Sequence, residues 1–331
     1  MESVLTGLLA IAIGVGGIVA LFHGLNVAAN SLPSWLGNRL RPYFFILPAM
    51  LAVGVFLLYP AARTVFESFR RAQVQQGVRE EFFTLDNYRY LLTDDGLASA
   101  MWNNLIWLLI VPIGAVAVGL AVAVLADRLR RRGENVAKSL IFMPMAVSFV
   151  GASTVWGFVY AWRPEGQDQI GLLSEVARVL GMFPTEQTWL QNQAINDFLL
   201  MVIVIWLQAG FAMVLLSAAI KAVPEDTIEA ARIDGATEMQ TFWRVVVPQI
   251  KSTIVVVLTT ILILVLKVFD VVRVLTSGNF NTNVVANEYY DQAFTFGDRG
   301  KASVIVVALM VATIPFMIVN VRRFREQEAT S

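Results

Sequence analysis

Residues 224–248 form a polar stretch between two long apolar ones: Pro224-Glu-Asp-Thr-Ile-Glu-Ala-Ala-Arg-Ile-Asp-Gly-Ala-Thr-Glu-Met-Gln-Thr-Phe-Trp-Arg-Val-Val-Val-Pro248. The two acidic residues after the opening proline are typical of a helix first turn, because carboxylates meet the positive end of the helix dipole there. Asp234-Gly235 predicts the end of that helix, since glycine readily adopts the left-handed cap geometry. We expect a second short helix over about residues 236–247, ending at the closing proline.

The remainder of the 331-residue chain is dominated by apolar side chains. Hydrophobic residues make up 57% of the sequence and charged residues 15%, a balance typical of integral membrane proteins. The 25 Lys and Arg cancel the 25 Asp and Glu, so no overall charge favours a nucleic acid as partner. The chain has no cysteine and one histidine, His23, which excludes thiolate sites and histidine-rich metal clusters.

Seven apolar stretches are long enough to span a bilayer. Crossing about 30 Å of hydrocarbon takes about 20 residues, because each backbone polar group must be satisfied within its own helix. Pro144 lies inside the fourth stretch, where a membrane helix can tolerate it. The predicted fold class is an all-α integral membrane protein, a polytopic bundle with helices at residues 4–22, 43–62, 104–126, 138–161, 198–220, 252–271 and 302–321.

Short loops rich in Lys and Arg predict the orientation, because such loops tend to stay in the cytoplasm. The arginine run at 128–132 with Lys138, and the tail Arg322-Arg323-Phe324-Arg325, must lie on the same side because four spans separate them. We expect both to be cytoplasmic and to contact lipid headgroups. Residues 221–251 and the C-terminus are then cytoplasmic, and the N-terminus is outside.

Three segments lie outside on this topology: 63–103, 163–197 and 272–301. The first has enough aromatic and turn-forming residues to form a small ordered cap. The outer segments carry an excess of Asp and Glu, and the cytoplasmic segments an excess of Lys and Arg. The neutral total therefore conceals two oppositely charged surfaces.

The helix expected after Pro224 has an apolar face of Ile228, Ala230, Ala231 and Ile233 that needs to be buried. Such a helix can lie on the membrane surface or insert into a groove of another protein. Its acidic residues make it a poor ligand for the anionic inner leaflet, which favours the protein groove.

The spacing within this loop resembles a known motif. Glu229-Ala230-Ala231, three residues, Gly235, nine residues and Val245-x-Val247-Pro248 is similar to the EAA motif of permease subunits of ATP-binding-cassette (ABC) importers. The family has Ile and Leu where this chain has its two valines, which are conservative apolar replacements.

Further stretches resemble the same family in the same order. Residues 41–48 resemble its entry into the first core span, and 85–88 with Asn103-Asn104 resemble its outer loop. Residues 269–278, followed by 289–294, look like the segment after its cytoplasmic loop. The resemblance covers about residues 41–325 and is to the MalF-type member of a heteromeric pair of carbohydrate permeases, in particular of α-glucoside type.

The resemblance implies a six-helix ABC importer permease core plus one extra N-terminal transmembrane helix. Residues 1–40 would hold the extra helix and a cytoplasmic linker. Residues 41–325 would form the permease domain, with periplasmic loop 63–103 and cytoplasmic coupling loop 221–251, and residues 326–331 a cytoplasmic tail. The first helix can be a lipid-facing addition, an assembly contact through its glycines or an interfacial hairpin.

The implied function is that of the transmembrane permease subunit of an ATP-driven, binding-protein-dependent importer of sugars or oligosaccharides in the bacterial inner membrane. The implied partners are a second, MalG-type permease that supplies the other half of the pathway, two copies of an ATPase subunit, an extracytoplasmic sugar-binding protein, the carbohydrate and membrane lipid. The chain is not expected to be an enzyme, because Gly297–Ala302, its nearest approach to a phosphate loop, lacks the required spacing. ATP and magnesium are expected on the ATPase, with no cofactor, catalytic residue or metal site on this chain.

Two sets of residues are candidates for function. The resemblance implies that the coupling loop enters a groove of the ATPase, with Glu229 accepting hydrogen bonds there and Gly235 setting the angle between two helices. The ATPase-coupling candidates are Glu225, Glu229, Ala230, Ala231, Asp234, Gly235 and Pro248.

The pathway candidates are polar and aromatic residues within the spans. Gln208 can donate and accept hydrogen bonds, while Trp206 and Phe211 can stack on a sugar ring or simply pack the core. Lys267 and Asp270 are expected three residues apart on one helix face, either as an ion pair or as a lining for sugar hydroxyls.

Three alternatives compete with this interpretation. The first is a related ABC importer for another small polar solute, such as a polyol or glycerol phosphate. A secondary transporter would need a coupling-ion site near the midplane and usually internal repeats, and the sequence shows neither. A membrane enzyme would need clustered His, Asp or Ser on one face.

Overall fold

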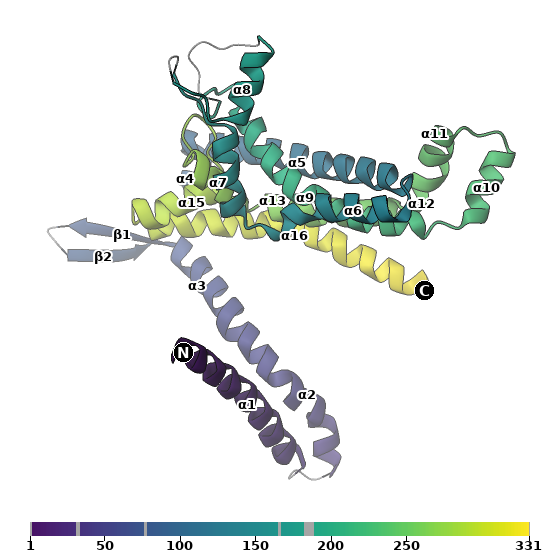
Figure 1. Ribbon diagram of the computed structural model, residues 1–331. Coiled ribbons are helices and arrows are strands. Elements are labelled where there is room, and N and C mark those ends of the chain that lie inside the picture. The colour runs from purple at the N-terminus through teal and green to yellow at the C-terminus, as the bar shows by residue number, and fades with distance from the viewer. Residues whose placement is uncertain (1, 31–33, 76–77, 165–166, 182–188, 331) are drawn as a thin grey trace. The chain divides into compact units, whose positions relative to one another are not determined.

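The computed structural model describes residues 2–30, 34–75, 78–164, 167–181 and 189–330. This part of the chain is almost entirely helical and divides into two units, Met1–Phe66 and Glu67–Ser331 (Figure 1). The domain boundaries that the sequence suggests, after residues 40 and 325, stay predictions.

The first unit contains two long helical segments that lie side by side. Helix α1 packs against α2, and the rings of Phe22 and Phe45 stack with their centroids 6.1 Å apart. An apolar stretch of 27 residues, Pro42–Ser68, is long enough to cross a membrane. The bounds are α1 (Glu2–Asn30), α2 (Ser34–Val53), a π-helical turn η1 (Gly54–Leu58) and α3 (Tyr59–Ser68), which continues just past the unit boundary.

The second unit opens with a feature that the all-α prediction missed. Strands β1 (Arg70–Gln75) and β2 (Val78–Phe83) form an antiparallel hairpin in which Arg70 is opposite Phe83. The sequence of β2, Val-Arg-Glu-Glu-Phe-Phe, lacks the strict alternation of polar and apolar residues that identifies a half-buried strand. The ordered cap expected over residues 63–103 therefore contains this hairpin as well as helix α4 (Asp86–Thr93).

The remaining elements of the second unit are helical. They are α5 (Asp95–Asp127), α6 (Arg131–Phe142), the 3₁₀ turn η2 (Met143–Ala146), α7 (Phe149–Val159), α8 (Leu172–Val179), α9 (Asn196–Lys221), α10 (Glu225–Ile233), α11 (Glu238–Thr241), the π turn η3 (Phe242–Val246), α12 (Val247–Gln249), α13 (Lys251–Val265), α14 (Asp270–Leu275), α15 (Val285–Tyr290), the π turn η4 (Asp291–Thr295) and α16 (Arg299–Thr330).

Within the described residues, four helices are long and apolar enough to cross a membrane, and the number rises to six if each of two bent helix pairs is one span. One bent pair corrects the continuous helix predicted over 138–161. The segments Arg131–Ala146 and Phe149–Val159 meet at 105°. Pro144 ends the regular hydrogen bonding of α6, and Ser148 begins a new helix by accepting the amide hydrogen of Gly151 at 3.1 Å.

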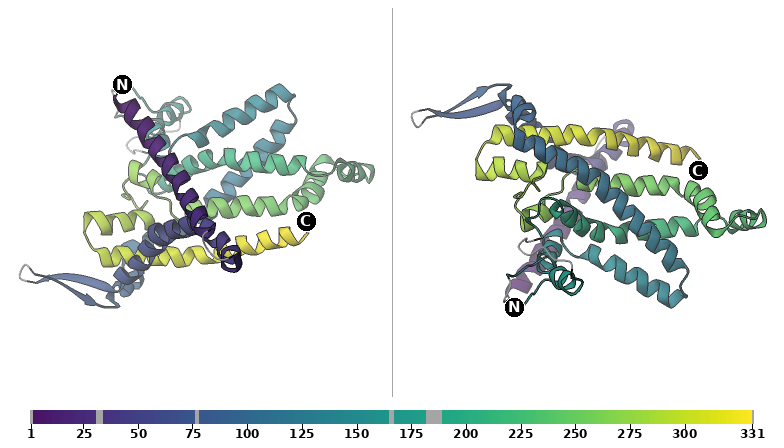
Figure 2. Two further views of the ribbon diagram at one scale, coloured as in Figure 1. Left: turned by 90° about the horizontal axis from the view of Figure 1, so that it is seen from below. Right: turned by 90° about the horizontal axis from the view of Figure 1, so that it is seen from above.

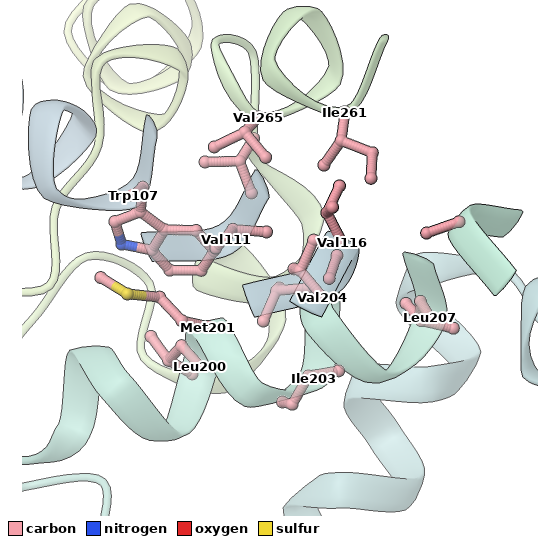
Figure 3. Close-up of a cluster of buried hydrophobic side chains, with 14 of the residues drawn as sticks. Trp107, Val111, Val116, Leu200, Met201, Ile203, Val204, Leu207, Ile261 and Val265 are labelled. Atoms are coloured by element: carbon pink, nitrogen blue, oxygen red, sulfur yellow. The ribbon is translucent and has the colours of Figure 1, made fainter. Parts of the chain in front are cut away.

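Helix α9 packs mainly against α5 and forms the core of the second unit (Figure 3). Trp107 and Val111 of α5 meet residues 200–207 of α9, and Val265 of α13 closes the cluster. At Gly119 a side chain would come within 2.6 Å of the Ala212 Cβ, so the backbones approach through a position that only glycine can occupy. Such close packing matters in a bilayer. Because lipid is as apolar as the helices, burying apolar side chains between helices does little to drive helix–helix association there.

Candidate functional site

Helix α10 begins and ends where the sequence predicts. Its first turn carries Glu225 and Asp226 directly after Pro224. At the other end Gly235 has a φ of 82°, and its amide hydrogen bonds to the Arg232 carbonyl at 3.0 Å. The next amide, of Ala236, bonds to the carbonyl of Ala231 at 3.0 Å. These two bonds form a Schellman motif, which satisfies the last carbonyls of α10 within the loop.

The turn between α10 and α11 is also held by its own side chains. The Arg232 guanidinium donates to both carboxylate oxygens of Glu238, at 3.0 and 3.4 Å. Thr237 and Gln240 form a reciprocal capping box at the start of α11. Helices α10 and α11 with their linking turn are therefore a locally closed unit whose angle is fixed by sequence-adjacent contacts.

The helix after this turn does not stop at Pro248 as predicted. It continues to Gln249, and the bend of 69° toward α13 falls at Ile250. Within it the Val247 amide bonds to the carbonyl of Phe242, five residues back, as in a π-helix. Since Pro248 has no amide hydrogen, the irregular bonding begins just before the position where the regular ladder would fail.

Six of the seven coupling candidates are exposed. Three apolar side chains of the same loop are also exposed: Ile233 by 86%, Met239 by 67% and Trp243 by 56%. Ile228 is half-buried, so the apolar face predicted for the helix is divided between the bundle and solvent. Of the predicted set, Glu225, Glu229, Ala230, Asp234, Gly235 and Pro248 are exposed and Ala231 is half-buried.

The pathway candidates on α9 differ in environment. Gln208 is buried, and its side chain makes no hydrogen bond with any described residue. The Trp206 ring meets the edge of Trp156, with centroids 5.7 Å apart, and Trp156 in turn packs against Tyr160. Phe211 packs against the main core. Of the two roles considered for this residue, core packing and stacking on a sugar ring, this contact fits core packing.

Lys267 and Asp270 do not share a helix face. Helix α13 ends at Val265, Lys267 lies in the following turn, and Asp270 opens α14. The predicted helix over 252–271 is too long: after Val265 the amides of Lys267 and Val268 bond to carbonyls three residues back, at 3.3 and 3.0 Å, and the Leu266 carbonyl accepts a hydrogen bond from the Asn104 side chain at 3.4 Å. A role for Lys267 or Asp270 in the pathway stays a prediction.

Two asparagines without a predicted role brace the loop over residues 276–285, hereafter the braced loop. Asn103 donates to the backbone carbonyls of Asn281 and Asn283 at 2.7 and 2.9 Å. Asn104 accepts the amide hydrogen of Val285 at 2.8 Å, and both asparagines are buried. The signal available in the sequence was an Asn-Asn pair at the start of an apolar span, where polar side chains are costly unless paired.

A second missed cluster ties the other ends of α5, α6 and α9 together. Lys138 forms ion pairs with Asp127 at 3.4 Å and with Glu134, and it donates a hydrogen bond to Ser217. Lys221 pairs with the same two carboxylates. From the sequence, Lys138 is expected only to indicate the orientation of the chain in the membrane. In the structure its ammonium group joins α5, α6 and α9.

No group of three or more His, Asp or Glu side chains that could hold a metal ion occurs among the described residues.

Residues 115–323, more than half of the chain, match the family described as the binding-protein-dependent transport system inner membrane component. The chain belongs to this family. It is a permease subunit of a binding-protein-dependent ABC importer and a multi-pass inner-membrane protein, which confirms the fold class and the general function expected from the loop motif.

Two relatives cover most of the permease. It is 42% identical over 336 residues to the alpha-glucoside transport system permease protein AglF of Rhizobium meliloti, covering 97% of each chain. It is 47% identical over 284 residues to the osmoprotective compounds uptake permease protein GgtC of Synechocystis, covering 86% of this chain and 99% of the relative.

Solved structures share the fold of the permease. A bacterial ABC transporter involved in the import of the acidic polysaccharide alginate has a chain that superposes with a TM-score of 0.72 at 19% identity, covering 88% of this chain and 99% of that one. The alginate transporter in complex with an alginate pentasaccharide-bound periplasmic protein gives a TM-score of 0.70. These likenesses confirm the architecture of the helical bundle.

Proposed function

We propose that this permease imports a carbohydrate of the α-glucoside class and forms half of the translocation pathway with a second permease subunit. Support for the substrate class comes from the similarity to the alpha-glucoside permease, which extends over 97% of both chains. Support for the pathway comes from Gln208, a buried amide that makes no hydrogen bond with any described residue. Such an amide can donate to and accept from the hydroxyls of a sugar. The Trp206 ring, two residues earlier and on another side of α9, packs against Trp156 and offers an aromatic face.

The coupling loop is proposed to bind one of two copies of an ATPase subunit, which would use ATP and magnesium. The observation that carries this proposal is that α10 and α11 have their ends capped within the loop while exposing Ile233, Met239 and Trp243. A unit that is closed by its own hydrogen bonds but leaves large apolar side chains uncovered fits the groove of a protein partner. The exposed carboxylate of Glu229 would accept hydrogen bonds at the rim of that groove.

The proposal can be tested by cross-linking and by uptake. Because the natural chain has no cysteine, Glu229→Cys places a unique thiol in the loop, and Glu175→Cys places one on exposed helix α8. In the assembled importer, a short thiol-to-amine cross-linker should join the first variant, but not the second, to the ATPase subunit. Glu229→Ala should also lower ATP-dependent uptake of a labelled α-glucoside, while Glu175→Ala retains it. Equal cross-linking at both positions would contradict the assignment of the loop.

A second candidate substrate class has its own support. The relative at 47% identity is a permease for osmoprotective compounds, so a small polar osmoprotectant is the main alternative to an α-glucoside. Competition distinguishes the two: uptake of labelled maltose, an α-glucoside that is not a typical osmoprotectant, should be unaffected by excess glycine betaine, sorbitol or glycerol 3-phosphate. Gln208→Ala should raise the KM for the sugar more than it lowers the maximal rate, because it removes a binding group and leaves the coupling loop intact.

A further inference from the structure

A groove of about 830 Å³ lies between α5 and the coupling loop, and Met239 and Trp243, two of the side chains assigned to the ATPase surface, form part of its lining. One wall is the last three turns of α5, including Ala117, Ala121 and Val124, and the other is formed by Phe242 and Val246 with the neighbouring helix ends. The walls are mostly apolar. This volume is in the range of pockets that bind small molecules, so the groove can hold a sizeable apolar group.

The charged groups of the groove leave one cation without a partner. Asp127 is paired with Lys138 and Lys221, and Arg232 is paired with Glu238. Arg128, the C-cap of α5, also lines the groove and makes no ion pair with any described residue. The net charge available to a ligand is therefore positive.

A buried hydroxyl adds a second, independent feature. Thr241 is 3% exposed and lines the groove, yet its Oγ1 is the only fully buried side-chain polar atom without a hydrogen-bond partner in the described part of the chain. Leaving a buried polar atom without a partner is destabilising, so a donor or acceptor brought into the groove would relieve a cost that the chain alone leaves. Apolar walls, an unpaired guanidinium and an unsatisfied hydroxyl together suit a molecule with an acyl chain and an anionic head.

We propose that this groove binds an anionic phospholipid, with an acyl chain between α5 and η3 and the phosphate near Arg128. The groove lies where the apolar part of α5 ends, next to an exposed arginine run at 130–132, which is where headgroups of a leaflet would lie. The inference uses the proposed cytoplasmic side of the coupling loop, since anionic lipid is abundant in that leaflet, but it does not depend on the transported substrate. The lipid would fill the space behind the coupling loop and hold the loop at its angle to α5.

Native mass spectrometry of the full chain in detergent tests the proposal, with dioleoyl phosphatidylglycerol and dioleoyl phosphatidylethanolamine as probes. The wild-type chain should retain phosphatidylglycerol in preference to phosphatidylethanolamine. Arg128→Gln should weaken phosphatidylglycerol binding about fivefold, the effect of one cation near an anionic lipid headgroup. Arg130→Gln, which removes the same charge from an exposed position outside the groove, should leave binding unchanged.

A second variant keeps the test valid if the charge change disturbs folding. Ala121 is exposed and lines the groove, so Ala121→Phe should fill the space and remove binding of both lipids without disturbing the packed core. Thr241→Val should retain the fold, because it replaces an unsatisfied hydroxyl with a methyl group, and should weaken phosphatidylglycerol binding less than Arg128→Gln.

Four results would each overturn the proposal. They are equal retention of the two lipids by the wild type, equal losses in Arg128→Gln and Arg130→Gln, displacement of the lipid by inorganic phosphate alone, and loss of the lipid when the ATPase subunits assemble. The third would indicate a free-anion site and the fourth a contact of the ATPase. Because cross-linking at residue 229 and sugar uptake are measured separately, failure of lipid binding leaves the proposed transport function standing.

Discussion

The coupling loop and the braced loop lie at opposite ends of the second unit and are held in different ways (Figures 1 and 2). The braced loop is fastened to the bundle by amide side chains of other helices, such as Asn103 and Asn196, whose bonds reach across the fold. The coupling loop is fastened to itself, through Gly235 and the Arg232–Glu238 pair. A segment braced by the bundle is fixed in place by other helices, whereas a segment braced by itself has a shape that does not depend on its position against the bundle.

Gly235→Pro should have the largest effect, because it breaks the shape of the self-braced loop. Proline fixes φ near about −65° and has no amide hydrogen, whereas Gly235 has a φ of 82° and donates to Arg232. ATP-driven uptake should fall to background while the chain remains in the membrane, as measured by sugar uptake and immunoblotting of membranes. Gly181→Pro is the matched control, since Gly181 also has a positive φ, of 64°, in an exposed loop. Normal uptake by Gly235→Pro would show that the angle between α10 and α11 is not needed.

Asn104→Leu should test the braced loop by destabilising the bundle rather than by uncoupling it. The variant leaves the buried Val285 amide without its 2.8 Å acceptor, at a cost of about 1–3 kcal/mol in the free energy of unfolding. Thermal unfolding of the purified protein should show a lower Tm. Asn135→Leu removes an exposed amide on α6 and should leave Tm nearly unchanged. Equal Tm values for the two variants would mean that the bond to Val285 does not brace the loop.

Breaking the Arg232–Glu238 pair should have a smaller effect than altering Gly235. Both side chains are more than half exposed, and exposed ion pairs contribute little because water and salt screen them. We expect Glu238→Gln to lower the initial uptake rate by about twofold, with partial recovery when the charges are exchanged in Arg232→Glu/Glu238→Arg. If the exchanged pair is as defective as Glu238→Gln, the guanidinium acts on a partner and not on α11.

Glu175→Gln should have the smallest effect, because its ion pair with Arg178 is on the exposed side of α8 and joins neither loop to the bundle. The Arg178 guanidinium donates to the carboxylate and holds the pKa of Glu175 below its usual 4.5. A lowered folded-state pKa means that any stabilisation is present above pH 4.5 and is lost as the pH falls through that lowered value. The Tm difference between wild type and variant should be within error at pH 7 and should not grow on acidification; a growing difference would contradict this pairing.

What the sequence predicted correctly was local. The start of α10 after Pro224 and its end at Gly235 follow from one proline and one glycine, whose backbone preferences act wherever they occur. The positions of α5 and α9 follow from long apolar runs with few charges. The EAA spacing and its exposure could be anticipated because the motif lies within 25 residues of chain.

What the sequence did not predict depends on partners that are distant in the chain. Asn104 meets Val285 only after the bundle has folded, and Lys138 finds Ser217 in the same way. The early end of α13 before Lys267 goes with a contact between Asn104 and the Leu266 carbonyl, residues 162 positions apart, so no pattern within that span could reveal it. The bend after Pro144 could not be predicted, because the sequence does not show whether Ser148 continues the first helix or caps a new one, as it does in the structure.

Helix α9 connects the two loops as one continuous helix. It runs for 26 residues, about 39 Å, with no proline in its sequence. At one end the Asn196 side chain bonds to the Phe280 carbonyl of the braced loop at 2.9 Å, and at the other Lys221 leads directly into the coupling loop. Because no proline interrupts α9, we expect a displacement of Lys221 to be transmitted along the helix to Asn196, and through its hydrogen bond to the braced loop.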